Sequence, residues 1–225
     1  MKYTFMFSRR AAGFTLVEMA VVLAIVALLL GGLLPTISSQ IEQQRRSEVR
    51  KQMDEIQQAL MGYAIVNGRL PCPAKATIAT GSPSAGMFDC TLSPLTGVVP
   101  WATLGTSETD AWGRRFTYTV SSTFATSSFI LTSTGTLTVK NAAAGINIAS
   151  NIPAVFVSHG TNGLGAYTSQ GTPIAASSDP DEADNSNGGT TFVSHYFVQN
   201  GFDDLVVWIS PNVLMNRMVA AGKLP

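Results

Sequence analysis

The sequence predicts an α+β protein in which a long N-terminal α-helix packs on an antiparallel β-sheet. Three observations support this fold class. An apolar run fills residues 14–34, an amphipathic helical pattern continues to residue 67, and short β-branched and aromatic runs fill the remainder. A chain of 225 residues accommodates one main domain in addition to a non-globular segment.

The apolar run from Phe14 to Leu34 contains only two polar residues, Thr15 and Glu18. A helix of this length spans about 30 Å, which is the thickness of the hydrocarbon core of a bilayer. The run therefore predicts a membrane segment, and Pro35 after it predicts a kink. A charge inside such a span costs about 2.5–3.5 kcal/mol at the helix centre, so the single carboxylate needs an explanation.

Beyond Pro35, apolar side chains recur three and four positions apart, which is the spacing of one helical face. They are Val49, Met53, Ile56, Leu60 and Tyr63. Opposite charges four positions apart, such as Glu42 and Arg46, indicate that the other face is solvated. Asn67 and Gly68 predict the end of the helix.

The remaining chain alternates β-like runs with turns rich in Gly, Asn, Ser and Thr. A loop from Arg69 to Thr109 comes first. Strands are then predicted at residues 115–121, 128–133, 136–140, 153–158, 191–198 and 205–209. Ser210 suits the N-cap of a short C-terminal helix, and Gly222 suits the position that follows its last turn.

Two cysteines, Cys72 and Cys90, lie in the long loop. In an exported domain they would form one disulfide, whereas in a cytosolic chain they would stay reduced. A zinc site is disfavoured, because His159 and His195 are distant in sequence and stand in no ligand spacing.

Composition argues against a nucleic-acid partner, and the motifs argue against an enzyme. The net charge is zero and only 12% of the residues are charged, so no strong field indicates a nucleic-acid partner. The sequence contains no G-x-S-x-G, H-E-x-x-H or phosphate-loop motif. His159 lies in a Gly/Asn-rich turn and His195 in a predicted strand, and we interpret both as structural.

The stretch RRAAG-FTLVE at residues 9–18 resembles the prepilin signal of type IV pilins and type II secretion pseudopilins. A short basic leader ends at Gly13, an aromatic Phe14 opens the apolar run, and Glu18 follows. A secretory signal peptide fits less well, because the run is long, contains a glutamate and lacks an A-x-A site. A plain signal anchor leaves Glu18 unexplained.

The resemblance implies four segments. Residues 1–13 would be a leader, 14–35 the transmembrane and filament-core helix, 36–67 the amphipathic half of that helix, and 68–225 a periplasmic head domain. The protein would sit in the inner membrane as a single-pass subunit before it enters a pilus or pseudopilus.

The resemblance also implies roles for three residues. A prepilin peptidase would cut between Gly13 and Phe14, and the new amine of Phe14 would be methylated. Glu18 would be the assembly residue, paired with the amine of the adjacent subunit. The expected partners are other pilin or pseudopilin subunits, the peptidase, the inner-membrane assembly platform and membrane lipid.

These inferences favour a structural subunit, of the minor class because its mature chain would be longer than most major pseudopilins. The alternative is an adhesin or a DNA-capturing minor pilin of a competence system. DNA as a partner is disfavoured, because acidic residues outnumber basic ones in the head.

Two stretches of the head add to the resemblance. Residues 109–118 resemble the D-x-W-G…Y stretch of major pseudopilins, and residues 158–163 resemble their S-x-G-x-[DN]-G turn. In major pseudopilins a loop after that turn can bind calcium. The corresponding hard oxygen ligands here would be Asp179, Asp181, Glu182 and Asp184, although their spacing matches no complete loop motif. No other cofactor is expected.

Overall fold

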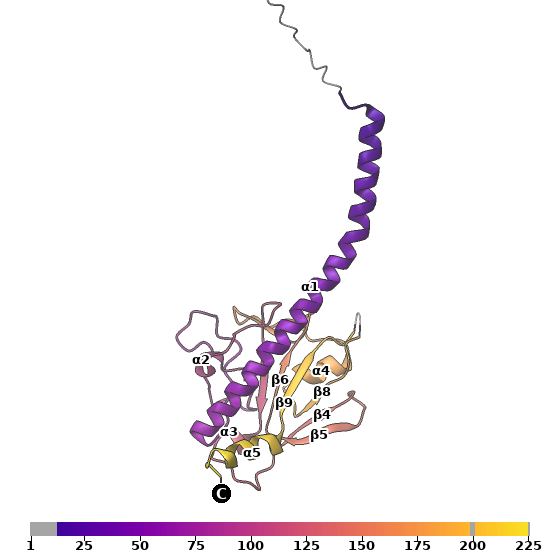
Figure 1. Ribbon diagram of the computed structural model, residues 1–225. Coiled ribbons are helices and arrows are strands. Elements are labelled where there is room, and N and C mark those ends of the chain that lie inside the picture. Colours follow the sequence, from indigo (N-terminus) through magenta and orange to yellow (C-terminus); the bar gives the residue numbers. More distant parts are fainter. Residues whose placement is uncertain (1–12, 199–200, 225) are drawn as a thin grey trace, which may run out of the picture. The chain divides into compact units, whose positions relative to one another are not determined.

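The computed structural model describes residues 13–198 and 201–224, with the side chains of residues 30–38 outside the description. The chain divides into two compact units, residues 1–44 and 45–225. Helix α1 (Leu16–Asn67) supplies residues to both units and continues through Pro35 without interruption (Figure 1). The predicted long helix is thus confirmed, while the kink at Pro35 stays a prediction. Apart from Gly13, the predicted leader lies outside the described residues.

A four-stranded antiparallel sheet forms the centre of the second unit. Its strand order is β1 (Thr96–Val98), β3 (Thr117–Val120), β6 (Ala154–Ser158) and β9 (Leu205–Ile209). The register places Phe156 of β6 between Tyr118 of β3 and Val207 of β9. The α+β fold class with an antiparallel sheet is therefore confirmed.

Within the described residues, two smaller sheets and four short helices complete this unit. One sheet has the order β5 (Asn147–Ile152), β4 (Leu137–Lys140) and β8 (Thr191–Val193), and the other pairs β2 (Arg114–Arg115) with β7 (Tyr167–Thr168). The pairing of β4 with β8 is parallel, unlike all the others. The helices are α2 (Trp101–Leu104), α3 (Ser122–Ala125), α4 (Pro180–Ser186) and α5 (Pro211–Ala220).

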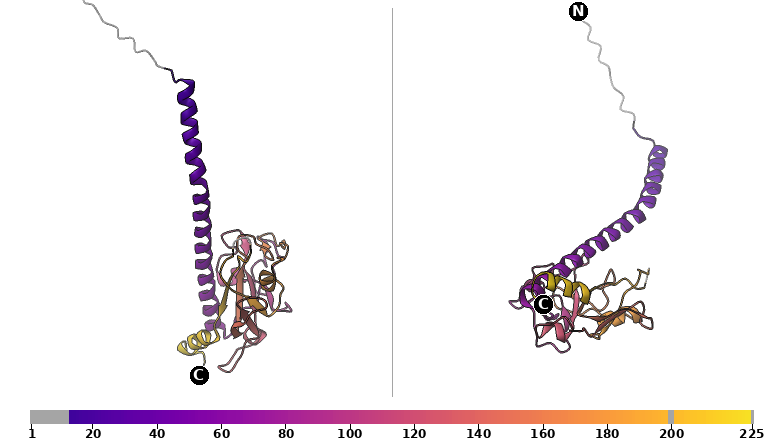
Figure 2. Two further views of the ribbon diagram at one scale, coloured as in Figure 1. Left: turned by 90° about the vertical axis from the view of Figure 1, so that its right-hand side faces the viewer. Right: turned by 60° about the horizontal axis from the view of Figure 1, so that its bottom comes forward.

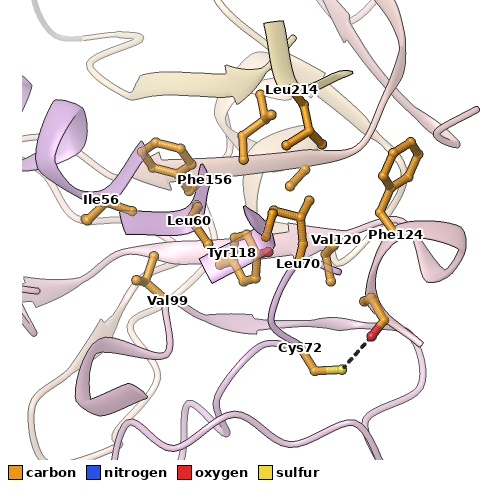
Figure 3. Close-up of a cluster of buried hydrophobic side chains, with 14 of the residues drawn as sticks. Ile56, Leu60, Leu70, Cys72, Val99, Tyr118, Val120, Phe124, Phe156 and Leu214 are labelled. Carbon is orange, nitrogen blue, oxygen red and sulfur yellow. Dashed lines mark hydrogen bonds between the residues drawn. The ribbon is translucent and has the colours of Figure 1, made fainter. Parts of the chain in front are cut away.

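The larger hydrophobic core lies between one face of the central sheet and the C-terminal part of α1. The predicted apolar face of the helix is buried in it through Val49, Met53, Ile56 and Leu60. Figure 3 shows Ile56 and Leu60 beside Phe156 and Tyr118 of the sheet. Leu214 of α5 joins the same core, and Figures 1 and 2 both show α5 at the C-terminal end of α1.

A second core covers the opposite face of the central sheet. Successive side chains of a strand point to opposite faces, so Phe156 enters the first core while Val155 and Val157 enter the second. Leu137 of β4 and Phe192 of β8 pack against them from the smaller sheet. Because both faces are covered, every residue of β6 is buried, which explains its continuous apolar pattern.

Two strand predictions were wrong at least in part. Residues 128–133 form no strand: Phe129 is buried against Phe124, but Ile130 and Leu131 are exposed, and the Ile130 amide donates to the Ser133 hydroxyl in a turn. The run at 191–198 is a strand only over β8. Sequence reasoning also missed β5, whose residues NIASNI are mostly polar and exposed.

One buried cation holds the long loop against the sheet. Arg115 is completely buried and donates to the backbone oxygens of Ala76, Ile78 and Ser169. It also forms an ion pair with Glu108 at 2.8 Å. A guanidinium group has five N–H donors in a fixed plane, so one side chain can fasten several carbonyl groups at once.

Candidate functional site

The cysteines of the long loop form a disulfide, Cys72–Cys90. The half-cystine Cys72 is buried in the larger core, and Cys90 lies toward the surface. The disulfide joins residues 18 positions apart and therefore ties the loop to the core. The sequence left open whether the two cysteines are oxidised or reduced, and the structure contains the disulfide.

The four acidic residues predicted to bind calcium do not converge. Asp179 caps α4, where its carboxylate accepts the Asp181 amide at 2.8 Å. Asp181 accepts the Ala143 amide and lies 3.0 Å from the imidazole Nε2 of His195. Asp184 accepts the side-chain amide of Asn187. The three carboxylates therefore make separate contacts, because a helix directs consecutive side chains to different sides.

The fourth residue, Glu182, points inward and meets two carboxylates that the sequence did not single out. Asp203 and Asp204 directly precede β9, and one carboxylate oxygen of each of the three residues lies within 4.8 Å of the others. All three side chains are buried. We call Glu182, Asp203 and Asp204 the acidic triad.

Amide donors surround the acidic triad. The side chain of Asn162 donates to Glu182 at 2.9 Å, and its backbone amide donates to Asp203 at 2.9 Å. The side chain of Asn185 donates to Asp204 at 2.9 Å. The pKa of Asp203 is raised to about 6, chiefly by burial, while the backbone amide of Asn162 opposes the change and the carboxylates of Glu182 and Asp204 add to it. Burial likewise raises the pKa of Asp204.

His159 lies beside the triad and is completely buried. Its Nε2 is 2.8 Å from the hydroxyl of Thr117, and its Nδ1 is 3.6 Å from the Oδ1 of Asp204. The following residue, Gly160, has a positive φ of 55°, and any side chain there would collide with Asp203. The turn that resembled S-x-G-x-[DN]-G therefore packs directly against the acidic triad.

The D-x-W-G stretch has a structural role in the same region. Asp110 is buried and accepts the amides of Trp112 and Arg114, both at 3.0 Å, and the Ser158 hydroxyl at 2.7 Å. Burial raises its pKa, and these hydrogen bonds act in the opposite direction. Asp110 thereby connects the turn before β2 to the end of β6.

At the other end of the chain, Glu18 forms a capping box with Thr15. The Thr15 hydroxyl accepts the Glu18 amide at 3.2 Å, and the Glu18 carboxylate accepts both the Thr15 amide at 2.8 Å and the Thr15 hydroxyl at 2.9 Å. This reciprocal arrangement satisfies amides that a helix N-terminus otherwise leaves unpaired. Its sequence signature, T-x-x-E, is present at residues 15–18.

The apolar side chains that follow this cap are exposed. Leu16 is 91% exposed and Leu28 is 78% exposed, and the large apolar side chains between them are 43–71% exposed. Exposed apolar surface of this extent marks a site for protein or lipid contact. The segment therefore combines a capped helix start, one carboxylate and a continuous apolar surface.

Comparison with known proteins decides the nature of this segment. Residues 8–34 match the family model described as the prokaryotic N-terminal methylation motif. The chain carries the N-terminal methylation motif of type IV pilins and pseudopilins. The resemblance inferred from residues 9–18 is thus confirmed, and the match supports a pilin-like or pseudopilin-like protein. No curated protein and no solved structure matches the chain.

The methylation motif overlaps the predicted membrane segment. Within the residues whose side chains are described, no helix is long and apolar enough to cross a membrane. The predicted span ends at residues 30–34, and their side chains lie outside the described set. The single membrane pass therefore stays a prediction.

Proposed function

We propose that this protein is a structural subunit, of the minor class, of a type IV pilus or a type II secretion pseudopilus. The observation that carries this proposal is the methylation motif at residues 8–34. In this proposal, a prepilin peptidase cleaves between Gly13 and Phe14, the Phe14 amine is methylated, and the apolar helix anchors the subunit in the inner membrane. The same helix later packs among neighbouring subunits through an assembly platform, so the protein works as a building block and not as an enzyme.

The geometry of the helix start supports this sequence of events. Glu18 lies one turn inside an exposed apolar helix, and cleavage would create a positive amine at Phe14, four residues away. Opposite charges in a medium of low dielectric constant attract strongly. An amine from a neighbouring subunit would therefore compete with Thr15 for the same carboxylate and set the register between subunits.

Mass spectrometry of the mature protein tests the processing step. We expect a chain that begins with N-methylated Phe14. A mature chain that begins near residue 40 would indicate an ordinary signal peptidase and would contradict the proposal.

Two variants separate the charge of Glu18 from its capping role. Glu18→Gln removes the charge but keeps the capping box, because glutamine also serves at this position. Thr15→Ala removes the hydroxyl of the cap and leaves the charge. We expect both variants to be processed, and Glu18→Gln alone to lose incorporation into filaments isolated from cells. Equal incorporation of Glu18→Gln and wild type would show that the charge does not direct assembly.

A further inference from the structure

Four asparagines of the chain are followed directly by glycine. They are Asn67, Asn162, Asn187 and Asn200. In such a pair the backbone nitrogen of the glycine can attack the side-chain carbonyl carbon of the asparagine, because glycine has no side chain that blocks the approach. The dipeptide is the same at all four positions. The structure distinguishes three of them, since Asn200 lies outside the described residues.

The pair at the end of α1 is held by the helix. The Gly68 amide, whose nitrogen would make the attack, donates to the Ala64 oxygen at 2.8 Å. The side chain of Asn67 donates to the Tyr63 oxygen at 2.9 Å. Both reacting groups are thus engaged in hydrogen bonds, and the reaction would have to break them at a cost in free energy.

The pair in the turn after β6 is held in the same way. The Gly163 amide donates to the His159 oxygen at 2.9 Å. The side chain of Asn162 donates to Glu182 at 2.9 Å and accepts the Leu164 amide at 2.7 Å. This asparagine therefore cannot turn toward the glycine nitrogen unless these hydrogen bonds are lost.

The pair after α4 differs in its attacking nitrogen. The Gly188 amide donates to no group of the described residues. Beyond its chain neighbours, no heavy atom lies within 4 Å of the point where a side chain on Gly188 would begin. Asn187 is exposed, and together with Gly188 it borders a cavity of about 530 Å³. Water can therefore reach both reacting groups.

The side chain of Asn187 is also prepared for the attack. Its carbonyl oxygen accepts the Gly189 amide at 2.7 Å. A donor in this position stabilises the negative charge that develops on the oxygen when a nucleophile adds to the carbonyl carbon. Asn162 has a comparable donor in the Leu164 amide. The two pairs therefore differ chiefly in whether the glycine nitrogen is free to react.

We propose that Asn187 is a site of spontaneous deamidation. The Gly188 nitrogen gives its proton to solvent and forms a bond to Cγ of Asn187, and the bond from Cγ to Nδ2 breaks. Nδ2 takes a proton from solvent and leaves as ammonia, so that a five-membered cyclic imide remains. One water molecule then opens the ring at either carbonyl carbon and gives aspartate or isoaspartate. Neither an oxidant nor a reductant is required.

The reaction would change the charge at the end of α4. The Nδ2 group of Asn187, which donates to Asp184, would be replaced by a carboxylate oxygen, so two like charges would meet there. Negative charge near the C-terminus of a helix is also unfavourable because of the helix dipole. Both effects would weaken the end of the helix that carries Glu182. The inference does not depend on the role of the protein in a filament.

Incubation of the full-length protein in detergent micelles at mildly alkaline pH tests the assignment. Samples are taken at intervals and digested, and mass spectrometry follows each asparagine, with fragment spectra that separate isoaspartate from aspartate. We expect Asn187 to convert roughly tenfold faster than Asn67 and Asn162, since only these two must first lose a hydrogen bond of the attacking nitrogen. Equal or slower conversion of Asn187, or conversion without isoaspartate, would overturn the proposal.

The same chain in denaturant is the matched control. Unfolding removes the hydrogen bonds that distinguish the three pairs, so Asn67, Asn162 and Asn187 should then convert at similar rates. If Asn187 kept its lead in the unfolded chain, the neighbouring residues and not the fold would select it. That result would overturn the structural basis of the assignment.

Two substitutions test the mechanism and its consequence. Asn187→Gln keeps the amide but lengthens the side chain, so the five-membered ring cannot form, and unchanged conversion at this position would contradict the cyclic imide. Asn187→Asp introduces one product and should lower the melting temperature of the head. The control is Asn216→Asp, which adds the same charge at an exposed position of α5. Equal melting temperatures for the two aspartate variants would contradict the weakening of α4.

Discussion

The two parts of α1 use apolar residues in opposite ways. Between residues 16 and 29 the helix exposes leucine, valine and isoleucine side chains to the surroundings, whereas Val49, Ile56 and Leu60 are completely buried in the head. Their sequences differ in a simple respect. The first part is apolar on all sides and its apolar side chains are exposed, while the second part has one apolar face that its own chain covers.

Two carboxylates, Glu18 of the first part of α1 and Asp110 of the head, differ in the same sense. Glu18 is held by Thr15, three positions away, and by no other described residue. Asp110 is held by groups from two elements and connects the turn before β2 to the end of β6. The carboxylate of the first part of the helix is thus satisfied locally, whereas that of the head is satisfied by contacts that are distant in sequence. This difference can be tested by substitution.

The largest effect is expected from truncation of the buried helix face. Leu60→Ala should lower the free energy of unfolding of the head by about 2–5 kcal/mol, because it leaves a cavity beneath the central sheet. The matched control is Leu23→Ala on the first part of the helix, where leucine is 63% exposed. We expect it to change the same quantity by less than about 0.5 kcal/mol.

Denaturant unfolding of the full-length protein in detergent micelles, followed by tryptophan fluorescence, measures both values. Comparable destabilisation by the two variants would show that the first part of α1 contributes to folding of the head. The two parts of α1 would then not differ in what their apolar side chains stabilise. In isolated filaments we expect the reverse order of the two variants. Leu23→Ala should lower the incorporation of the subunit more than Leu60→Ala does.

The long helix and the buried apolar face of its second part could be predicted from sequence, because the relevant signals are local. Periodicity indicated the apolar face from Val49 to Leu60, and the motif at residues 8–34 is contiguous. The capping box is equally local, since its T-x-x-E signature is contiguous at residues 15–18. Strand β9 was predicted with its bounds intact for the same reason.

The acidic triad and the burial of Arg115 could not be predicted, since both depend on residues brought together by folding. Glu182 and Asp203 are separated by a loop and a strand, and only the antiparallel pairing of β6 and β9 places His159 near Asp204. Arg115 is the first residue of a predicted strand, where a solvated side chain is the ordinary expectation. Its side chain is instead completely buried and donates hydrogen bonds to three backbone carbonyl groups. Proximity in sequence instead favours the neighbours of Glu182 on α4 as its partners.

An intermediate effect is expected at Asp110. Asp110→Ala should lower the free energy of unfolding by about 1–3 kcal/mol, since it leaves the amides of Trp112 and Arg114 and the Ser158 hydroxyl without their acceptor. Asp110→Asn keeps one acceptor oxygen and should cost less. Glu18→Ala serves as the comparison and should leave the unfolding of the head unchanged.

Chemical denaturation of the three variants provides the measurement. A loss for Asp110→Asn as large as that for Asp110→Ala would mean that the charge, and not the hydrogen bonds, stabilises this junction. That result would be unexpected, because burial raises the pKa of Asp110 and so disfavours its charged form.

The smallest effect is expected at Asp89, a carboxylate of the head that is held locally, as Glu18 is. Hydrogen bonds from Thr91 and then from Lys75 lower its pKa from 3.8 to about 2. Because the folded pKa of Asp89 is below the unfolded one, the stability that this shift contributes is fully present above pH 3.8. It is lost as the pH falls through about 2. Its size should be small, since Asp89 is accessible to solvent and salt screens the Lys75 ion pair.

Carboxyl titration by NMR separates the two causes. Thr91→Ala should raise the pKa of Asp89 more than Lys75→Met does, because the Thr91 hydroxyl is the larger contributor. Added salt should reduce the effect of Lys75→Met and leave that of Thr91→Ala unchanged, since screening acts on charges and not on a neutral donor. If Lys75→Met gave the larger shift, Asp89 would be held by an ion pair rather than by a local turn, and its likeness to the Glu18 cap would be lost.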